Sequence, residues 1–162
     1  MSATPVASFP VAVIMARKII SRSGWSLPSW EAVGVVSGEQ FANQPRSREL
    51  IHEADGVQHF MFRGFVLQLH RDVAETYWYN LTAERPCLFV ICQKDEAEEL
   101  VPLMVTPDSE AAQAAVETHG AAFAVAIPPD IHTEIERVVV KYYRPEPPRK
   151  RKQHDWHKEK DQ

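Results

Sequence analysis

Runs rich in apolar residues recur along the first half of the chain, and in residues 65–70 Phe65, Leu67 and Leu69 recur with the two-residue period of a β-strand. Runs of β-branched and aromatic residues therefore predict several short strands, separated by segments that contain Gly, Pro and Ser. Loops are expected at residues 21–29 and 38–45. The strands are expected over residues 9–18, 30–36, 49–53, 57–62, 65–70 and 75–81.

A turn signal joins the third and fourth of these strands. Asp55-Gly56 separates them, and Asp-Gly is favoured where a two-residue turn requires positive φ. A turn at these residues determines which side chains face each other across the hairpin. The predicted cross-strand pairs are Ile51–Phe60 and His52–His59.

An aromatic cluster lies in the predicted strand at residues 75–81. Alternation would place Tyr77 and Tyr79 on one face and Trp78 on the other. One of these faces must belong to the core. The other is either core as well or an exposed patch that contacts another protein.

The continuous apolar run at residues 87–92 is typical of a central strand that is buried on both faces. Residues 100–105 predict a short strand at a sheet edge, because Pro102 cannot donate a ladder hydrogen bond. Cys87 and Cys92 would point to opposite faces of their strand, so no disulfide is expected between them.

Helix signals come late in the chain. Thr106 or Asp108 can cap a helix over residues 109–118, and Asp130 can cap a second one. The second helix has a single apolar stripe, formed by Ile131, Ile135, Val138, Val139 and Tyr142.

Locally paired strands followed by a C-terminal helix indicate an α+β fold with a mainly antiparallel sheet, or a partly closed barrel capped by that helix. By analogy, the shape would be pleckstrin-homology-like. We expect a flexible N-terminus at residues 1–8, one globular domain at residues 9–143, and a basic tail without fixed structure at residues 144–162.

The net charge of −4 combines a tail of +3 with a body of −7. An acidic body is a poor nucleic-acid platform, since phosphate binding needs a positive surface. No apolar run approaches the roughly 18 residues of a membrane span. The N-terminus does not have the pattern of a secretory signal, so we expect a cytoplasmic protein.

No phosphate-binding glycine loop, nucleophile elbow, zinc-protease motif or C-x-x-C pair occurs in the sequence. We therefore expect no enzyme activity and no cofactor. The alternative is a metal- or ligand-binding module at His52 and His59, whose Cβ atoms would lie about 5 Å apart on a hairpin. His70 is the candidate third ligand, and two half-exposed histidines beside a turn are the simpler interpretation.

Candidate partner-binding residues fall into two groups, and the partner would be a protein. They are the aromatic residues Tyr77, Trp78 and Tyr79 and the basic run Arg149, Lys150, Arg151 and Lys152.

Two further groups of polar residues have open interpretations. The acidic run at residues 95–99 is a solvated turn, a cation site or a receptor for the basic tail. A deep pocket lined by His70, Arg71, Asp72 and Asn80 would favour a small enzyme instead.

Four segments carry a family resemblance. They are FPVAVIMARK at residues 9–18, WEAVGVV at 30–36, LQLHRDVAETYWYNLTAERPCLFVIC at 67–92 and YYRPEPPRKRK at 142–152. Together they resemble an uncharacterised bacterial family of unknown function, whose members are typically encoded beside molybdenum- or tungsten-dependent formate dehydrogenase subunits. The resemblance implies a context and no site residues. The resulting hypothesis is a non-catalytic accessory or adaptor protein that assists assembly, maturation or docking of a formate-dehydrogenase-type molybdoenzyme.

Overall fold

The computed structural model describes residues 4–145. The helices in this range are α1 (Ala74–Leu81), α2 (Ser109–Glu117) and α3 (Pro129–Tyr142), with 3-10 turns η1 (Glu39–Phe41) and η2 (Arg71–Val73). The strands are β1 (Ala7–Arg22), β2 (Trp25–Ser37), β3 (Ser47–Ala54), β4 (Val57–Leu69), β5 (Leu88–Lys94), β6 (Leu100–Thr106) and β7 (Ala121–Val125).

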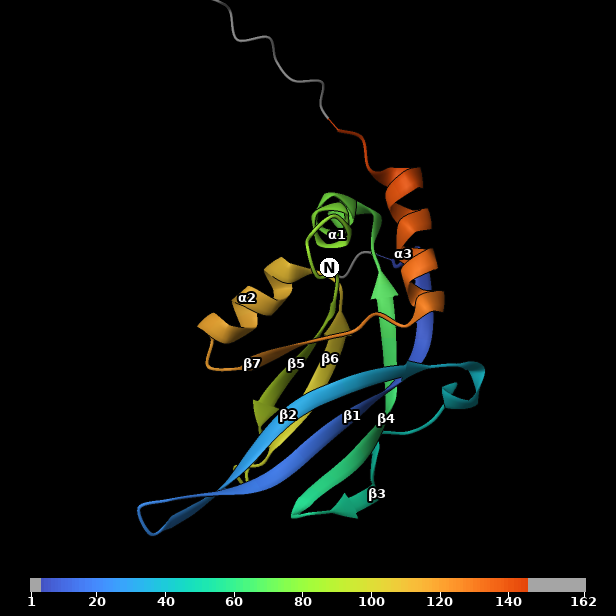
Figure 1. Ribbon diagram of the computed structural model, residues 1–162. Coiled ribbons are helices and arrows are strands. Elements are labelled where there is room, and N and C mark those ends of the chain that lie inside the picture. Colours follow the sequence, from blue (N-terminus) through green and yellow to red (C-terminus); the bar gives the residue numbers. More distant parts are fainter. Residues whose placement is uncertain (1–3, 146–162) are drawn as a thin grey trace, which may run out of the picture.

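The strands form two antiparallel sheets and not a closed barrel (Figure 1). The first sheet has the order β2-β1-β4-β3 and the second has the order β6-β5-β7. After β4 the chain enters η2 and α1 before β5 begins, so it leaves the first sheet before it starts the second. The α+β class with a mainly antiparallel architecture and a C-terminal helix is confirmed.

One core joins the two sheets, α1 and α3. Leu67 and Leu69 of β4, and Leu88 and Val90 of β5, are fully buried in it. The predicted stripe of α3 is confirmed, because its members Ile131, Ile135, Val138 and Val139 are buried and Tyr142 packs against them.

The predicted cap of α3 is wrong. Pro128 occupies the N-cap position, and the fixed φ of Pro129 suits the first helical turn. The carboxylate of Asp130 instead accepts a hydrogen bond from the Ser37 hydroxyl, whose oxygen lies 2.8 and 2.7 Å from the two carboxylate oxygens. This contact ties the first turn of α3 to the end of β2.

The predicted loop at residues 21–29 is mostly strand. β1 and β2 form one long hairpin, whose turn at Ser23-Gly24 has φ values of 49° and 80°. Pro28 is tolerated because β2 lies at the edge of its sheet, where a missing N–H breaks no second ladder.

The predicted strands at residues 57–62 and 65–70 are one continuous strand, β4. Gly64 adopts φ of 92° within it, and a Cβ there would lie 2.7 Å from the Arg46 backbone nitrogen. Glycine therefore permits the close approach between β4 and the backbone at Arg46.

The predicted strand at residues 75–81 is the helix α1. Its buried residues Ala74, Tyr77 and Asn80 recur every three positions, which is a helical and not a strand period. Packing of this face overrides the β-propensity of the aromatic residues.

The predicted hairpin turn is confirmed, since Asp55 and Gly56 have φ values of 53° and 77°. His52 faces His59 as predicted. The other predicted pair is wrong: Leu50 lies opposite Phe60, because a bulge leaves Ile51 as the extra residue.

The remaining elements follow their local signals. β5 is the central strand of its sheet and β6 lies at the edge. Asp108 caps α2 by accepting hydrogen bonds from the backbone N–H groups of Glu110 and Ala111. Cys87 and Cys92 are both free thiols.

Candidate functional site

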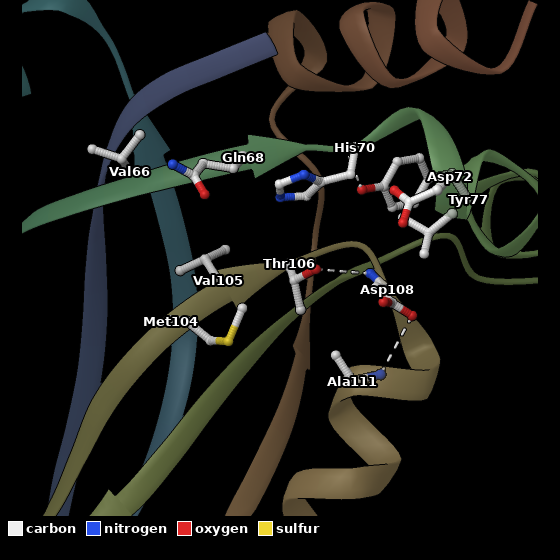
Figure 2. Close-up of a pocket in the computed structure, with 11 residues that line it drawn as sticks. Val66, Gln68, His70, Asp72, Tyr77, Met104, Val105, Thr106, Asp108 and Ala111 are labelled. Carbon is white, nitrogen blue, oxygen red and sulfur yellow. Dashed lines mark hydrogen bonds between the residues drawn. The ribbon is translucent and has the colours of Figure 1, made fainter. Parts of the chain in front are cut away.

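A groove lies where the end of β4 faces the end of β6, next to η2 and the start of α2 (Figure 2). Its volume is about 400 Å³, at the low end of ligand-binding cavities. Val66, Val105 and Met104 lie at one end beside Gln68, and most of the polar side chains, including Asp72 and Asp108, lie toward the other end. The groove is lined by Val66, Gln68, His70, Asp72, Val73, Tyr77, Met104, Val105, Thr106, Asp108 and Ala111.

Local hydrogen bonds position the polar end. The Tyr77 hydroxyl accepts a bond from the backbone N–H of His70 at 3.0 Å, which holds the end of β4 against α1. The Thr106 hydroxyl accepts a bond from the backbone N–H of Asp108 at 3.1 Å. Asp108 lines this end of the groove, and its carboxylate accepts a hydrogen bond from the backbone N–H of Ala111 in the first turn of α2 (Figure 2).

The polar end of the groove is electronegative. Burial raises the pKa of the Tyr77 phenol to about 12, and the carboxylates of Asp108 and Asp72 contribute to the same rise. No Lys or Arg lines the groove, and within residues 4–145 neither carboxylate has an ion-pair partner. The groove therefore suits a cationic group better than an anionic one.

The four polar residues at positions 70, 71, 72 and 80, which were considered as the lining of one pocket, are brought together only in part. His70 and Asp72 line the groove, whereas Arg71 and Asn80 do not. Asn80 is structural: its amide nitrogen donates to the carbonyl oxygens of Cys87 at 2.7 Å and Pro107 at 2.8 Å. Gln68, Thr106 and Asp108 were missed, because only the tertiary structure brings β6 beside β4.

A second candidate site is the free end of the β1–β2 hairpin, residues 19–28, which we call the arm. The last pair between β1 and β4 is Lys18–Val57, so the arm is a two-stranded ribbon that projects beyond the rest of the sheet (Figure 1). Its large apolar side chains are exposed: Ile19 by 51%, Ile20 by 38%, Trp25 by 73% and Leu27 by 62%.

The three aromatic residues proposed for partner binding do not share a surface. Tyr77 is buried, whereas Trp78 and Tyr79 are exposed by 40% and 61%. Trp78 stacks on Tyr143 of the C-terminal segment, with ring centroids 5.9 Å apart. The basic run of residues 149–152 lies outside the described residues.

The two hairpin histidines meet as predicted, with ring centroids 5.8 Å apart. A buried Nδ1 atom of His59 has no hydrogen-bond partner among residues 4–145. Within the same residues, no three His, Cys, Asp or Glu side chains gather as a metal-binding group. His70, the candidate third ligand, lines the groove instead.

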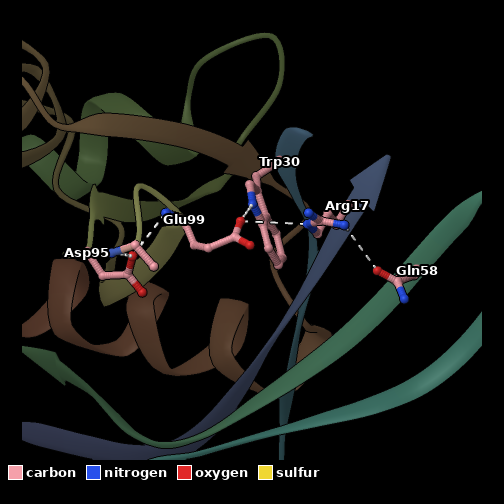
Figure 3. Close-up of polar contacts among 6 residues, drawn as sticks. Arg17, Trp30, Gln58, Asp95 and Glu99 are labelled. Atoms are coloured by element: carbon pink, nitrogen blue, oxygen red, sulfur yellow. Dashed lines mark hydrogen bonds and ion pairs between the residues drawn. The ribbon is translucent and has the colours of Figure 1, made fainter. Parts of the chain in front are cut away.

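The acidic run forms the turn between β5 and β6 (Figure 3). The Asp95 carboxylate accepts hydrogen bonds from the backbone N–H groups of Ala97 and Glu99. The Glu99 carboxylate accepts a bond from Trp30 Nε1 at 2.6 Å and lies 3.6 Å from Arg17 Nε. Both side chains therefore have structural roles.

None of the helices between residues 4 and 145 has the length and hydrophobicity that a bilayer crossing requires. In comparisons with known proteins, no curated protein and no solved structure matched the chain. One family model matched residues 10–152, nearly the whole chain. The chain therefore belongs to the family described as "Protein of unknown function (DUF3305)".

Proposed function

We propose that this protein is a non-catalytic accessory protein that binds another protein through the arm. The observation that carries the proposal is the exposure of Ile19, Ile20, Trp25 and Leu27 on one projecting ribbon. Fully burying one such side chain stabilises a complex by roughly 1.5–3 kcal/mol. Clusters of exposed apolar side chains of this kind mark interaction surfaces.

The arm also has a preferred partner chemistry. Cross-strand pairing places Ile20 beside Leu27 and Arg22 beside Trp25, on one face of the ribbon. Residues 18–30 include two basic residues, Lys18 and Arg22, and no acidic ones. The partner surface should therefore combine apolar residues with acidic ones.

As client we propose a formate-dehydrogenase-type molybdoenzyme or one of its accessory factors, whose assembly, maturation or docking the protein would assist. Support for the client comes from the sequence resemblance, which includes most of β1 and the second half of β2. Trp78, Tyr79 and the basic run of residues 149–152 are proposed as further contacts with the same client.

The test is a pull-down from the native host with three forms of the full chain. They are the wild type, the arm variant Trp25→Ser/Leu27→Ser, and the control Val140→Ser, which changes a 77% exposed residue of α3. We expect dehydrogenase subunits with the wild type and the control, and loss with the arm variant. Absence of these subunits from all three would exclude the client, and equal capture by the arm variant would exclude the arm.

A metal-binding module at His52 and His59 is the alternative proposal, supported by their cross-strand pairing. Its test is metal analysis of the purified full chain and of His52→Ala. One equivalent of metal that is lost in the variant supports the site. Far less than one equivalent in both proteins rejects it.

A further inference from the structure

The groove between β4 and β6 is lined by two carboxylates that form no ion pair with any of residues 4–145. Asp72 lies in η2, and Asp108 caps α2. Both contribute to the raised pKa of Tyr77, so both act on the same end of the groove. Among residues 4–145, no Lys or Arg lines this groove; Arg71, which precedes Asp72, lines a neighbouring hollow with it.

The described part of the chain ends close to this groove. Tyr143 stacks on Trp78 of α1, and the neighbouring residue Tyr77 lines the groove. α1 itself begins directly after η2, which holds Asp72. Only the width of one helix therefore separates the groove from the start of the C-terminal segment.

The C-terminal segment is long enough to cross this helix. Arg149 follows Arg144 by five residues, which span about 17 Å when extended. An α-helix with its side chains is about 10–12 Å wide, which is less than this reach. The four consecutive basic residues 149–152 can therefore reach Asp72 and Asp108 without rearrangement of the fold.

The other acidic group is a poorer receptor. The turn at residues 95–99 follows the end of β5, whereas α1 precedes its start (Figure 1). The seven residues of β5 separate them by about 23 Å. Glu99 is moreover already bonded to Trp30.

We propose that the basic run Arg149, Lys150, Arg151 and Lys152 docks within its own chain on the groove, with its cations at Asp72 and Asp108. Each exposed ion pair contributes little alone. The short tether raises the effective concentration of the run to the millimolar range, which favours docking. This inference goes beyond the proposed function, because it concerns the protein without a partner. The groove binds the basic run until a partner with a more acidic surface displaces it by competition.

The test is limited trypsin digestion of the full chain, with mass spectrometry of cleavage at residues 149–152. Asp72→Asn/Asp108→Asn removes both charges, and Asn at position 108 still caps α2. We expect cleavage of this variant to be about three- to tenfold faster than that of the wild type. The control Glu96→Gln/Glu98→Gln neutralises the other acidic group and should be cleaved at the wild-type rate.

Equal rates for the wild type and the Asn variant would overturn the proposal. Protection that increases with protein concentration would also overturn it, in favour of docking on a second copy. A second measurement does not depend on the Asn variant: the backbone amide resonance of Ala111 should differ between the wild type and a full chain with residues 149–152 changed to Gln. Superposition of the two resonances would contradict docking.

Discussion

The indole Nε1 of Trp30 donates a hydrogen bond of 2.6 Å to the carboxylate of Glu99. Trp30 belongs to β2 of the first sheet, and Glu99 belongs to the turn that joins β5 and β6 of the second. Figure 3 shows Arg17 of β1 beside the same carboxylate. One carboxylate therefore links the two sheets at the end of the molecule away from α1.

Removal of this link should destabilise the fold. Glu99→Ala leaves the Trp30 N–H without its acceptor and Arg17 without its ion-pair partner. We expect a loss of about 1.5–3 kcal/mol in the free energy of unfolding, measured by urea denaturation. Glu99→Gln keeps an acceptor and should lose less, and Glu96→Gln is the exposed control. A Glu99→Ala variant as stable as this control would show that the link is not structural.

Gly64 should not tolerate a side chain. Gly64→Ala would force a Cβ to within 2.7 Å of the Arg46 backbone at φ of 92°. We expect a loss of about 1–3 kcal/mol. Gly34→Ala is the matched control, because a Cβ at this strand position meets no atom within 4 Å. Equal thermal midpoints for the two variants would contradict the close approach of β4 and residue 46.

Asn80 should be the most sensitive polar residue of α1. Besides donating to two carbonyl groups, its side-chain oxygen accepts a bond from the backbone N–H of Cys87 at 3.1 Å. Asn80→Ala leaves these buried backbone groups without partners, and we expect a loss of about 2–4 kcal/mol. Thr82→Ala, at the exposed end of the helix, is the control. Near-equal denaturation midpoints for Asn80→Ala and the control would refute this role.

The two thiols should differ in reactivity. Burial raises the pKa of Cys92 to about 12, and it raises the pKa of the less buried Cys87 in the same direction. A raised thiol pKa means less thiolate at pH 8, and the thiolate is the species that reacts with a disulfide reagent. Cys87 should therefore react first, and Cys92 only after unfolding.

The same shift has a consequence for stability. Above pH 9 the unfolded chain loses the Cys92 proton while the folded chain keeps it, so the free energy of unfolding falls as the pH rises from about 9 toward 12.

The Cys87→Ala variant tests the burial of Cys92 directly. Cys92 is the thiol that remains in this variant, so its reaction with the disulfide reagent at pH 8 should report unfolding alone. Rapid reaction of this variant under native conditions would contradict the burial of Cys92.

Several elements were predictable because their signals are local. Asp55-Gly56 determines its own turn and hence the His52–His59 pair. The buried run that became β5 and the Asp108 cap of α2 likewise depend on neighbouring residues alone. The apolar stripe of α3 identified its core face before any packing partner was known.

The tertiary structure decided what depends on distant contacts. Residues 74–81 form a helix because Tyr77 and Asn80 find hydrogen-bond partners beside β4 and β5, which overrides the strand propensity of the aromatic residues 77–79. Residues 57–69 form one long strand where two were expected. The close approach of Gly64 to Arg46 joins residues that are distant in the sequence, so only the fold reveals it.

The candidate sites divide in the same way. The sequence by itself determined that the chain is an α+β protein with a hairpin that pairs His52 with His59 and with a basic run at residues 149–152. The groove exists only because β6 and α2 come to lie beside β4, since the side chains of Gln68 and Asp108 are forty positions apart in the chain. The exposure of Trp25 and Leu27 was likewise decided by the fold, because β4 ends its pairing with β1 at Lys18 and leaves the arm uncovered.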